Sequence, residues 1–188
     1  TYRMRGGSRK GSKTEGTNHP NGVMTYFYLN DYNEKDEVTL TYMEANGDII
    51  KKLSTKNKKK DKLEVKEAAN QFVWNMTYKG TEKLKGMILW WQSLNGPKAV
   101  PGTYKVKLSV KKEDADAVEI TKPFTILADP RAESTLVDMQ KQFDFIKDVN
   151  ETMDNAHKSI KKIRKINGKL SSFATQYKDD ENVKELVE

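Results

Sequence analysis

The most regular pattern in the chain is an alternation of apolar and polar side chains in short runs. In the run 70–78, every second residue is large and apolar: Phe72, Trp74, Met76 and Tyr78. Successive side chains of a β-strand point to opposite faces of a sheet, so a period of two places this row on one side. The row is either one wall of a core or a binding surface. We expect a core wall, with Trp74 between two sheets, because large exposed apolar patches are uncommon.

Six further runs have strand character, because they are short, rich in β-branched and aromatic residues, and bounded by turn residues. They cover residues 23–29, 37–43, 48–53, 87–91, 103–110 and 118–127. Asn46 and Gly47 predict a hairpin between the second and third runs, since both residues accept positive φ. Pro123 indicates that the last run lies at a sheet edge or contains a bulge. Seven strands without intervening helices predict an antiparallel β-sandwich over residues 19–128.

The period becomes helical after residue 131. The apolar residues that recur at helical spacing are Leu136, Met139, Phe143, Ile146, Met153, Ile160 and Ile163. Thr135 and Asp138 fit a capping box at the helix start, and Gly168 predicts its end. Such a helix is about 50 Å long and needs a partner along its whole stripe. Because Leu170 and Phe173 begin a second helical segment, we expect a helical hairpin over residues 129–188.

The two ends of the chain indicate a piece of a longer protein. Residues 1–18 are rich in Gly, Ser and basic side chains, which is typical of a flexible linker. The chain starts at Thr1, and an apolar pattern is still running at Val183 and Leu186 when it stops. We therefore expect the second helix to be cut short, and a signal peptide upstream would not be visible here.

Composition limits the chemistry. The chain has no cysteine, which removes disulfides and thiolate sites, and no apolar run long enough to span a membrane. We expect His19 and His157 to be structural or surface residues. The acidic clusters at 31–37 and 113–116 fall in predicted loops, so we expect solvated acids and no catalytic pair. The EF-hand pattern begins at Asp31 but fails at Lys35, which leaves only a looser calcium site open. We expect no cofactor.

The net charge of +7 raises the question of nucleic-acid binding. Its distribution argues against that function. One lysine run, at residues 56–62, has no interleaved aromatic residues or arginine, and the other cluster, at 158–169, follows a segment rich in acids. We interpret both clusters as solvated loop and helix surface.

Trp90 and Trp91 are the candidate contact residues. As neighbours on one predicted strand they would point to opposite faces, so at least one of them would be exposed unless the helix covers it. An exposed indole stacks well on sugar rings, which favours a carbohydrate-binding module. The alternative, which we prefer, is that one indole fills the sandwich and the other lies beneath the helix.

Several segments resemble a known family in their order along the chain. They are N-Q-F-V-W-N-M, M-I-L-W, G-P-K-A-V-P-G-T-Y-K-V-K-L and A-D-P-R, followed by the long helix. This order is similar to the C-terminal region of bacterial sortilin-like proteins, which carry Asp-box (BNR) propeller repeats and are often labelled glycosyl hydrolases. The sandwich also resembles the immunoglobulin-like domain of flagellar hook-cap proteins. The likeness covers about residues 20–168. Two positions depart from it: Asn75 stands where Asp is commoner, and Asn70-Gln71 stands where Asn-Arg is commoner.

The resemblance implies an immunoglobulin-like or fibronectin-III-like sandwich attached to an upstream propeller. The segment Y-R-M-R-G-G-S near the start of the chain resembles the exit from such a propeller. The Asp-box S-x-D-x-G-x-T-W is absent from this chain. The resemblance therefore implies a non-catalytic accessory region of a secreted, periplasmic or cell-surface protein. Its expected partners are the propeller of the same chain, another protein, or a glycan bound at Trp90 or Trp91. Neither nucleic acid nor a membrane span is expected.

Overall fold

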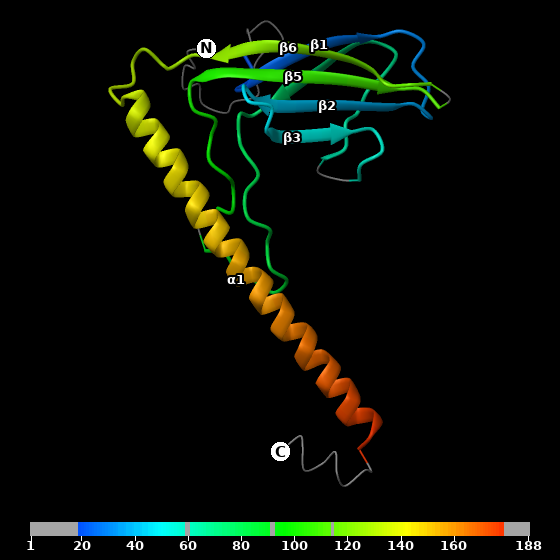
Figure 1. Cartoon of the computed structure of the whole chain (residues 1–188), viewed down its shortest axis with the longest axis vertical. Helices are drawn as coiled ribbons and strands as arrows, with labels where there is room; N and C mark the ends of the chain where they lie inside the picture. Colours follow the sequence, from blue (N-terminus) through cyan, green and yellow to red (C-terminus); the bar gives the residue numbers. More distant parts are fainter. Residues whose placement is uncertain (1–18, 59–60, 91–92, 114, 179–188) are drawn as a thin grey trace, which may run out of the picture.

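The computed structural model describes residues 19–58, 61–90, 93–113 and 115–178. The strands and the helix in this part are β1 (Val23–Leu29), β2 (Glu37–Glu44), β3 (Ile49–Ser54), β4 (Ala68–Trp74), β5 (Gly102–Lys111), β6 (Val118–Ile126) and α1 (Leu136–Gln176) (Figure 1). The strands pair antiparallel in two sheets, β1-β4 and β3-β2-β5-β6. A mainly antiparallel β body with a C-terminal helix is thus confirmed. The predicted linker at 1–18 and the predicted continuation at 179–188 lie outside the described residues.

Local turn chemistry sets the strand register as the sequence predicts. Gly47 adopts a φ of 101° between β2 and β3, and the Asn46 side chain accepts a hydrogen bond from the Asp48 backbone N–H at 3.0 Å. The predicted hairpin is therefore confirmed. Pro123 lies on β6, which among the described strands pairs only with β5, at the edge of its sheet. The missing N–H of Pro123 therefore leaves no gap inside the sheet, as the edge prediction requires.

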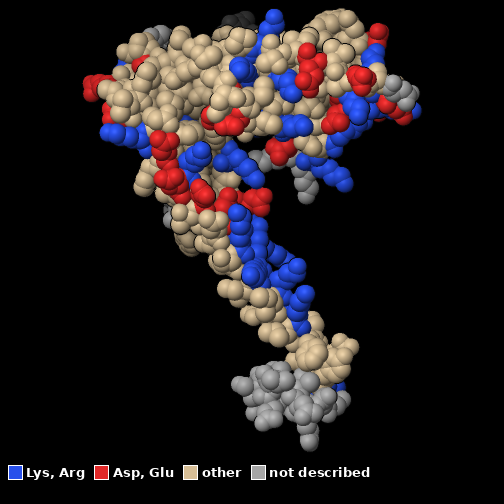
Figure 2. Space-filling model, viewed as in Figure 1, with Lys and Arg blue, Asp and Glu red and all other residues tan. Residues whose placement is uncertain are grey.

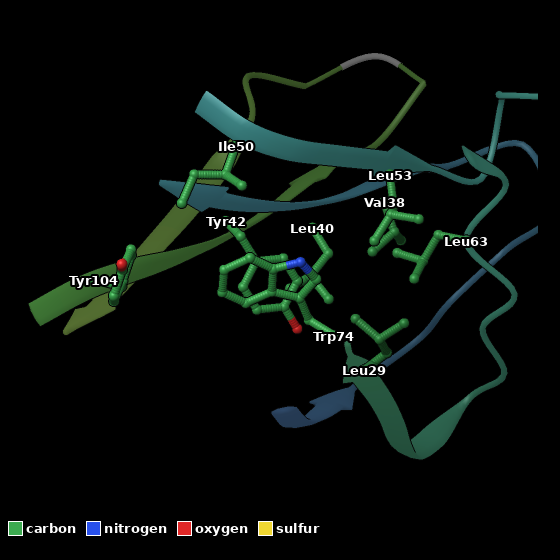
Figure 3. Packing of buried hydrophobic residues seen from close by; sticks show 9 residues of the cluster. All are labelled: Leu29, Val38, Leu40, Tyr42, Ile50, Leu53, Leu63, Trp74 and Tyr104. Atoms are coloured by element: carbon green, nitrogen blue, oxygen red, sulfur yellow. The ribbon is translucent and has the colours of Figure 1, made fainter. Parts of the chain in front are cut away.

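The core lies between the two sheets and centres on Trp74 (Figure 3). Trp74 is fully buried, and its indole stacks on Tyr42 of the other sheet with ring centroids 4.9 Å apart. Phe72 comes from the same face of β4, and its ring centroid lies 6.2 Å from that of Tyr42. Met76 and Tyr78 also pack against this core, although β4 has ended before them. The alternating row is therefore a core wall, as predicted.

The predicted strand at 87–91 is wrong. None of residues 87–90 belongs to a strand, and Trp91 lies outside the described residues. The described residues of the connection from β4 to β5, 75–90 and 93–101, instead leave the sheets, and the connection extends alongside α1 (Figure 1). We call it the loop arm. The error arose because a short apolar run has the same composition whether it pairs in a sheet or lies in an exposed loop.

The predicted helix end at Gly168 is also wrong. α1 runs without interruption for 41 residues, so the segment around Leu170 and Phe173 continues α1 and forms no hairpin with it. A glycine inside a helix costs about 1 kcal/mol, which neighbouring helix formers such as Lys169 and Leu170 offset. The N-terminal prediction is confirmed, because Thr135 and Asp138 form both hydrogen bonds of the capping box.

Candidate functional site: the loop arm and the helix

At the base of the loop arm, its first and last segments run side by side. The Tyr78 backbone N–H donates to the Pro97 carbonyl at 2.9 Å, and the Ala99 N–H donates to the Met76 carbonyl at 2.7 Å. A Cβ added at Gly80 would lie 1.9 Å from the carbonyl oxygen of Leu94. Only glycine permits this approach, so Gly80 allows the two segments at the base of the loop arm to pack against each other.

The loop arm holds one stripe of α1 through residues spaced seven apart. These residues are Phe143, Asn150, His157 and Arg164, and the loop arm meets them with Tyr78, Thr81, Glu82 and Lys85 in the same order. A seven-residue interval keeps side chains on nearly one face of a helix. The stripe therefore forms a ladder of contacts about 30 Å long.

The upper end of the ladder is aromatic. The rings of Tyr78 and Phe143 meet edge to face with centroids 4.7 Å apart. The Tyr78 hydroxyl donates to a carboxylate oxygen of Glu44 on β2 at 2.8 Å. Burial, and then the acceptor carboxylate, raise the pKa of Tyr78 far above its ordinary value, so its hydroxyl stays protonated. Tyr78 thus joins the sheet, the loop arm and the helix.

The middle of the ladder is polar and buried. The Thr81 hydroxyl donates to the backbone carbonyl of Asn150 at 3.2 Å and lies 3.3 Å from its side-chain oxygen. His157 is 7% exposed, and its Nδ1 lies 2.9 Å from the Glu82 carbonyl oxygen. Because a carbonyl only accepts, the Nδ1 nitrogen carries the proton and donates it. His157 is therefore structural, as predicted, and the exposed His19 contributes nothing to this ladder.

The lower end of the ladder is charged and more open. Arg164 donates from its Nη1 to the carbonyl of Lys85 at 2.7 Å, and Lys161 forms a 3.3 Å ion pair with Glu82 at the surface. Leu84 is buried nearby. Beyond Arg164, no described residue of α1 is buried. The end of the helix therefore projects past the loop arm (Figure 1).

Sequence reasoning missed this site because it followed only apolar residues. The signal that would have found it is the seven-residue spacing of Asn150, His157 and Arg164 after Phe143. Polar side chains at core-facing helical positions predict a partner that offers backbone carbonyls and hydroxyls rather than a second apolar helix.

A second stripe of α1 is apolar and exposed. It starts at Phe145, which is 68% exposed, and continues through Val149 to the projecting end of the helix, where Leu170 is 60% exposed. Its other large members are Ile163, Ile166, Phe173 and Tyr177. We call it the open stripe. It lies about 100–160° around the helix from the ladder, since beside the ladder each of its positions is one or two residues away from a ladder position.

The charges of α1 are segregated along its length, and Figure 2 shows acids near the sheets and a run of Lys and Arg farther down the helix. The acids of the first half are Asp138, Asp144, Asp148, Glu151 and Asp154, beside Lys141 and Lys147. The charged residues from 158 to 176 are all basic: Lys158, Lys161, Lys162, Arg164, Lys165 and Lys169. The open stripe therefore runs from an acidic into a basic environment.

Trp90 does not lie beneath the helix or in the core, contrary to the preferred interpretation. Its side chain is 77% exposed, and Ile88 beside it is 78% exposed. Trp91, its predicted neighbour on the opposite face, lies outside the described residues. An open groove of about 720 Å³ lies elsewhere, between β3 and the loop arm, and its lining includes Lys51, Thr77 and Glu82.

The acids of the two acidic clusters are mostly exposed, as expected for Asp31, Glu34, Glu113 and Asp116, but the expectation of a solvated acid is wrong for Asp36. Asp36 is buried, and its carboxylate accepts a hydrogen bond from the Asn33 N–H at 2.9 Å. Lys35 pairs with Glu113 at 3.1 Å on the surface, while Asp114 lies outside the described residues. Among the described residues, no three acidic or imidazole side chains gather closely enough to hold a metal ion.

Comparison with known proteins finds no similar protein, because no family model, curated protein or solved structure matches the chain. The resemblance to sortilin-like proteins therefore stays a prediction. Within the part of the chain that the structure describes, no helix is both long enough and apolar enough to cross a bilayer.

Proposed function

We propose that this chain is a non-catalytic accessory region of a larger secreted protein, and that it docks a protein partner through α1. The open stripe is the observation that carries this proposal. The loop arm contacts one face of α1, and large apolar side chains such as Phe145 and Leu170 remain in solvent on another. Exposed apolar patches of this kind mark interaction surfaces.

The geometry supports docking better than simple bracing. A brace would bury its apolar surface within its own domain, whereas the end of α1 extends beyond the sheets (Figure 1). A helix held at one end and free along an apolar face suits helix-in-groove or helix-pair recognition. The resemblance to sortilin-like proteins supports an immunoglobulin-like sandwich and an upstream propeller as the body that carries this helix.

Site-specific photo-crosslinking tests the docking function. We expect a photo-crosslinking amino acid in place of Ile166, on the open stripe, to form covalent adducts with protein in the extracellular fluid of the native organism. The same group at Thr175 is the matched control, because this exposed position points away from the open stripe. Equal labelling from both positions, or no adduct from Ile166, would contradict docking through this face.

A second candidate function is glycan binding at Trp90. The 77% exposure of its indole favours this function, since an aromatic face in solvent can stack on a sugar ring. Quenching of tryptophan emission by a polysaccharide panel, lost in Trp90→Phe, would support it. Quenching that persists in Trp90→Phe would assign the response to another indole, and no quenching would remove this candidate.

A further inference from the structure

The open stripe has the spacing of a coiled-coil seam. From Phe145 to Tyr177 its positions alternate by four and three residues without a break: 145, 149, 152, 156, 159, 163, 166, 170, 173 and 177. This is the a/d pattern of a heptad repeat, sustained over more than four heptads. Small or polar residues, Thr152, Ala156 and Ser159, occupy its centre, and large apolar residues occupy both ends.

We propose that the open stripe pairs antiparallel with the open stripe of a second copy of this chain. This pairing rests on the proposed docking function and identifies the docking partner as the second copy. With the twofold axis between residues 157 and 158, the stripe positions from 145 to 170 pair with one another. Large residues of one copy meet large residues of the other at two layers, Phe145 against Leu170 and Val149 against Ile166. Thr152 meets Ile163, and Phe173 and Tyr177 extend beyond these layers. Ala156 meets Ser159 at the axis, where small side chains let the helices approach closely.

Charge complementarity fixes the direction of pairing. Antiparallel helices place the acidic half of each copy beside the basic half of the other, whereas parallel helices would place six cations beside six cations. Next to the seam, Asp148 of one copy faces Lys169 of the other in the antiparallel arrangement. This pair forms twice because of the twofold symmetry.

The loop arm leaves room for the second helix. It holds the ladder, about 100–160° around α1 from the open stripe, and Phe145 remains 68% exposed at the end nearest the sheets. A membrane surface is a poorer occupant. The acidic first half of α1 would face anionic lipid, and Thr152 and Ser159 interrupt the apolar surface where the helix would insert.

Sedimentation equilibrium of the whole chain tests the pairing. We expect the mass to rise from the 21.6 kDa of one chain to twice that value as the concentration increases through the micromolar range. Leu170→Glu should abolish this rise, while Thr175→Glu, with the same charge change outside the seam, should preserve it. A chain that stays monomeric throughout overturns the proposal.

Charge reversal tests the specific contact. Asp148→Lys and Lys169→Asp should each weaken the dimer about tenfold, because each change disrupts two symmetric pairs. The double variant should recover the affinity, since the reversed pair attracts again. Additive weakening in the double variant would contradict the antiparallel register.

Spin labels test the direction. The chain has no cysteine, so Thr175→Cys carries the only thiol. In the antiparallel dimer the two labels lie about 50 Å apart, from a rise of 1.5 Å per residue on either side of the axis. A separation under about 20 Å would mean parallel pairing and would overturn the proposal.

Two outcomes separate this inference from the docking function. A photo-crosslink from Ile166 to an unrelated protein, with a monomeric chain, keeps docking and overturns the second copy as the partner. Cosedimentation with phosphatidylserine vesicles that Leu170→Glu abolishes, again with a monomeric chain, identifies a membrane-surface helix and overturns both.

Discussion

The Nδ1 nitrogen of His157 donates a hydrogen bond to the carbonyl oxygen of Glu82 across 2.9 Å, and this contact joins residues 75 positions apart in the chain. It lies in the middle of the ladder, between the aromatic contact at Phe143 and the charged contact at Arg164. This buried imidazole is thus one of the contacts that link the loop arm to the helix and leave the opposite side of α1 open.

Replacing His157 should loosen the loop arm. His157→Ala leaves the Glu82 carbonyl unsatisfied and removes a buried ring, so we expect a loss of about 1–3 kcal/mol in the free energy of unfolding. Amides of residues 78–85 should exchange faster with deuterium. His19→Ala is the control and should change neither quantity, because His19 is exposed. Equal effects from both variants would contradict the ladder.

Two glycine-to-alanine substitutions should change the free energy of unfolding in opposite directions. Gly80→Ala places a methyl group 1.9 Å from the Leu94 carbonyl oxygen, so the base of the loop arm must shift and the protein should lose about 2 kcal/mol or more. Gly168→Ala meets nothing within 4 Å and lies inside a helix, so it should stabilise α1 by up to about 1 kcal/mol. Chemical denaturation measures both. A destabilising Gly168→Ala would contradict the continuous helix.

Alkaline pH should destabilise the core through Tyr42. Burial raises the pKa of Tyr42 to about 12, whereas tyrosine in an unfolded chain titrates near 10. The folded protein therefore holds this proton more tightly, and its contribution to stability is complete below pH 10. It falls as the pH rises from about 10 to 12, by about 3 kcal/mol in total.

Tyr42→Phe tests that assignment. The variant loses the 2.7 Å hydrogen bond between the Tyr42 and Thr25 hydroxyls, so it should be about 1 kcal/mol less stable at neutral pH. Its stability should then fall less steeply above pH 10 than that of the parent, as followed by urea denaturation at each pH. An unchanged slope would assign the alkaline loss to other groups.

The β body was predictable from sequence because its signals are local. Asn46 and Gly47 specify their turn by backbone preference, and the alternation around Trp74 specifies one buried face. The loop arm was not predictable in this way. Its place beside α1 depends on contacts such as Thr81 with Asn150, 69 residues apart, which no local pattern encodes.

The helix shows the same division. Thr135 and Asp138 specify the start of α1 through a local capping box, and that start was predicted correctly. Gly168 was misread as its end because glycine is also frequent just past helix ends. Trp90 was misplaced because apolar composition does not distinguish a buried side chain from an exposed one.

The most direct test is hydrogen exchange along α1 in the dilute chain. If the loop arm holds the helix and leaves its end for docking, amides from about residue 140 to Arg164 should exchange slowly, and those from Ile166 to Gln176 much faster. His157→Ala should reduce this difference, because it weakens the contact of the loop arm with the first part of the helix. Uniform slow exchange to Gln176 in the dilute chain would mean that the end of the helix is already covered, and would contradict the docking function.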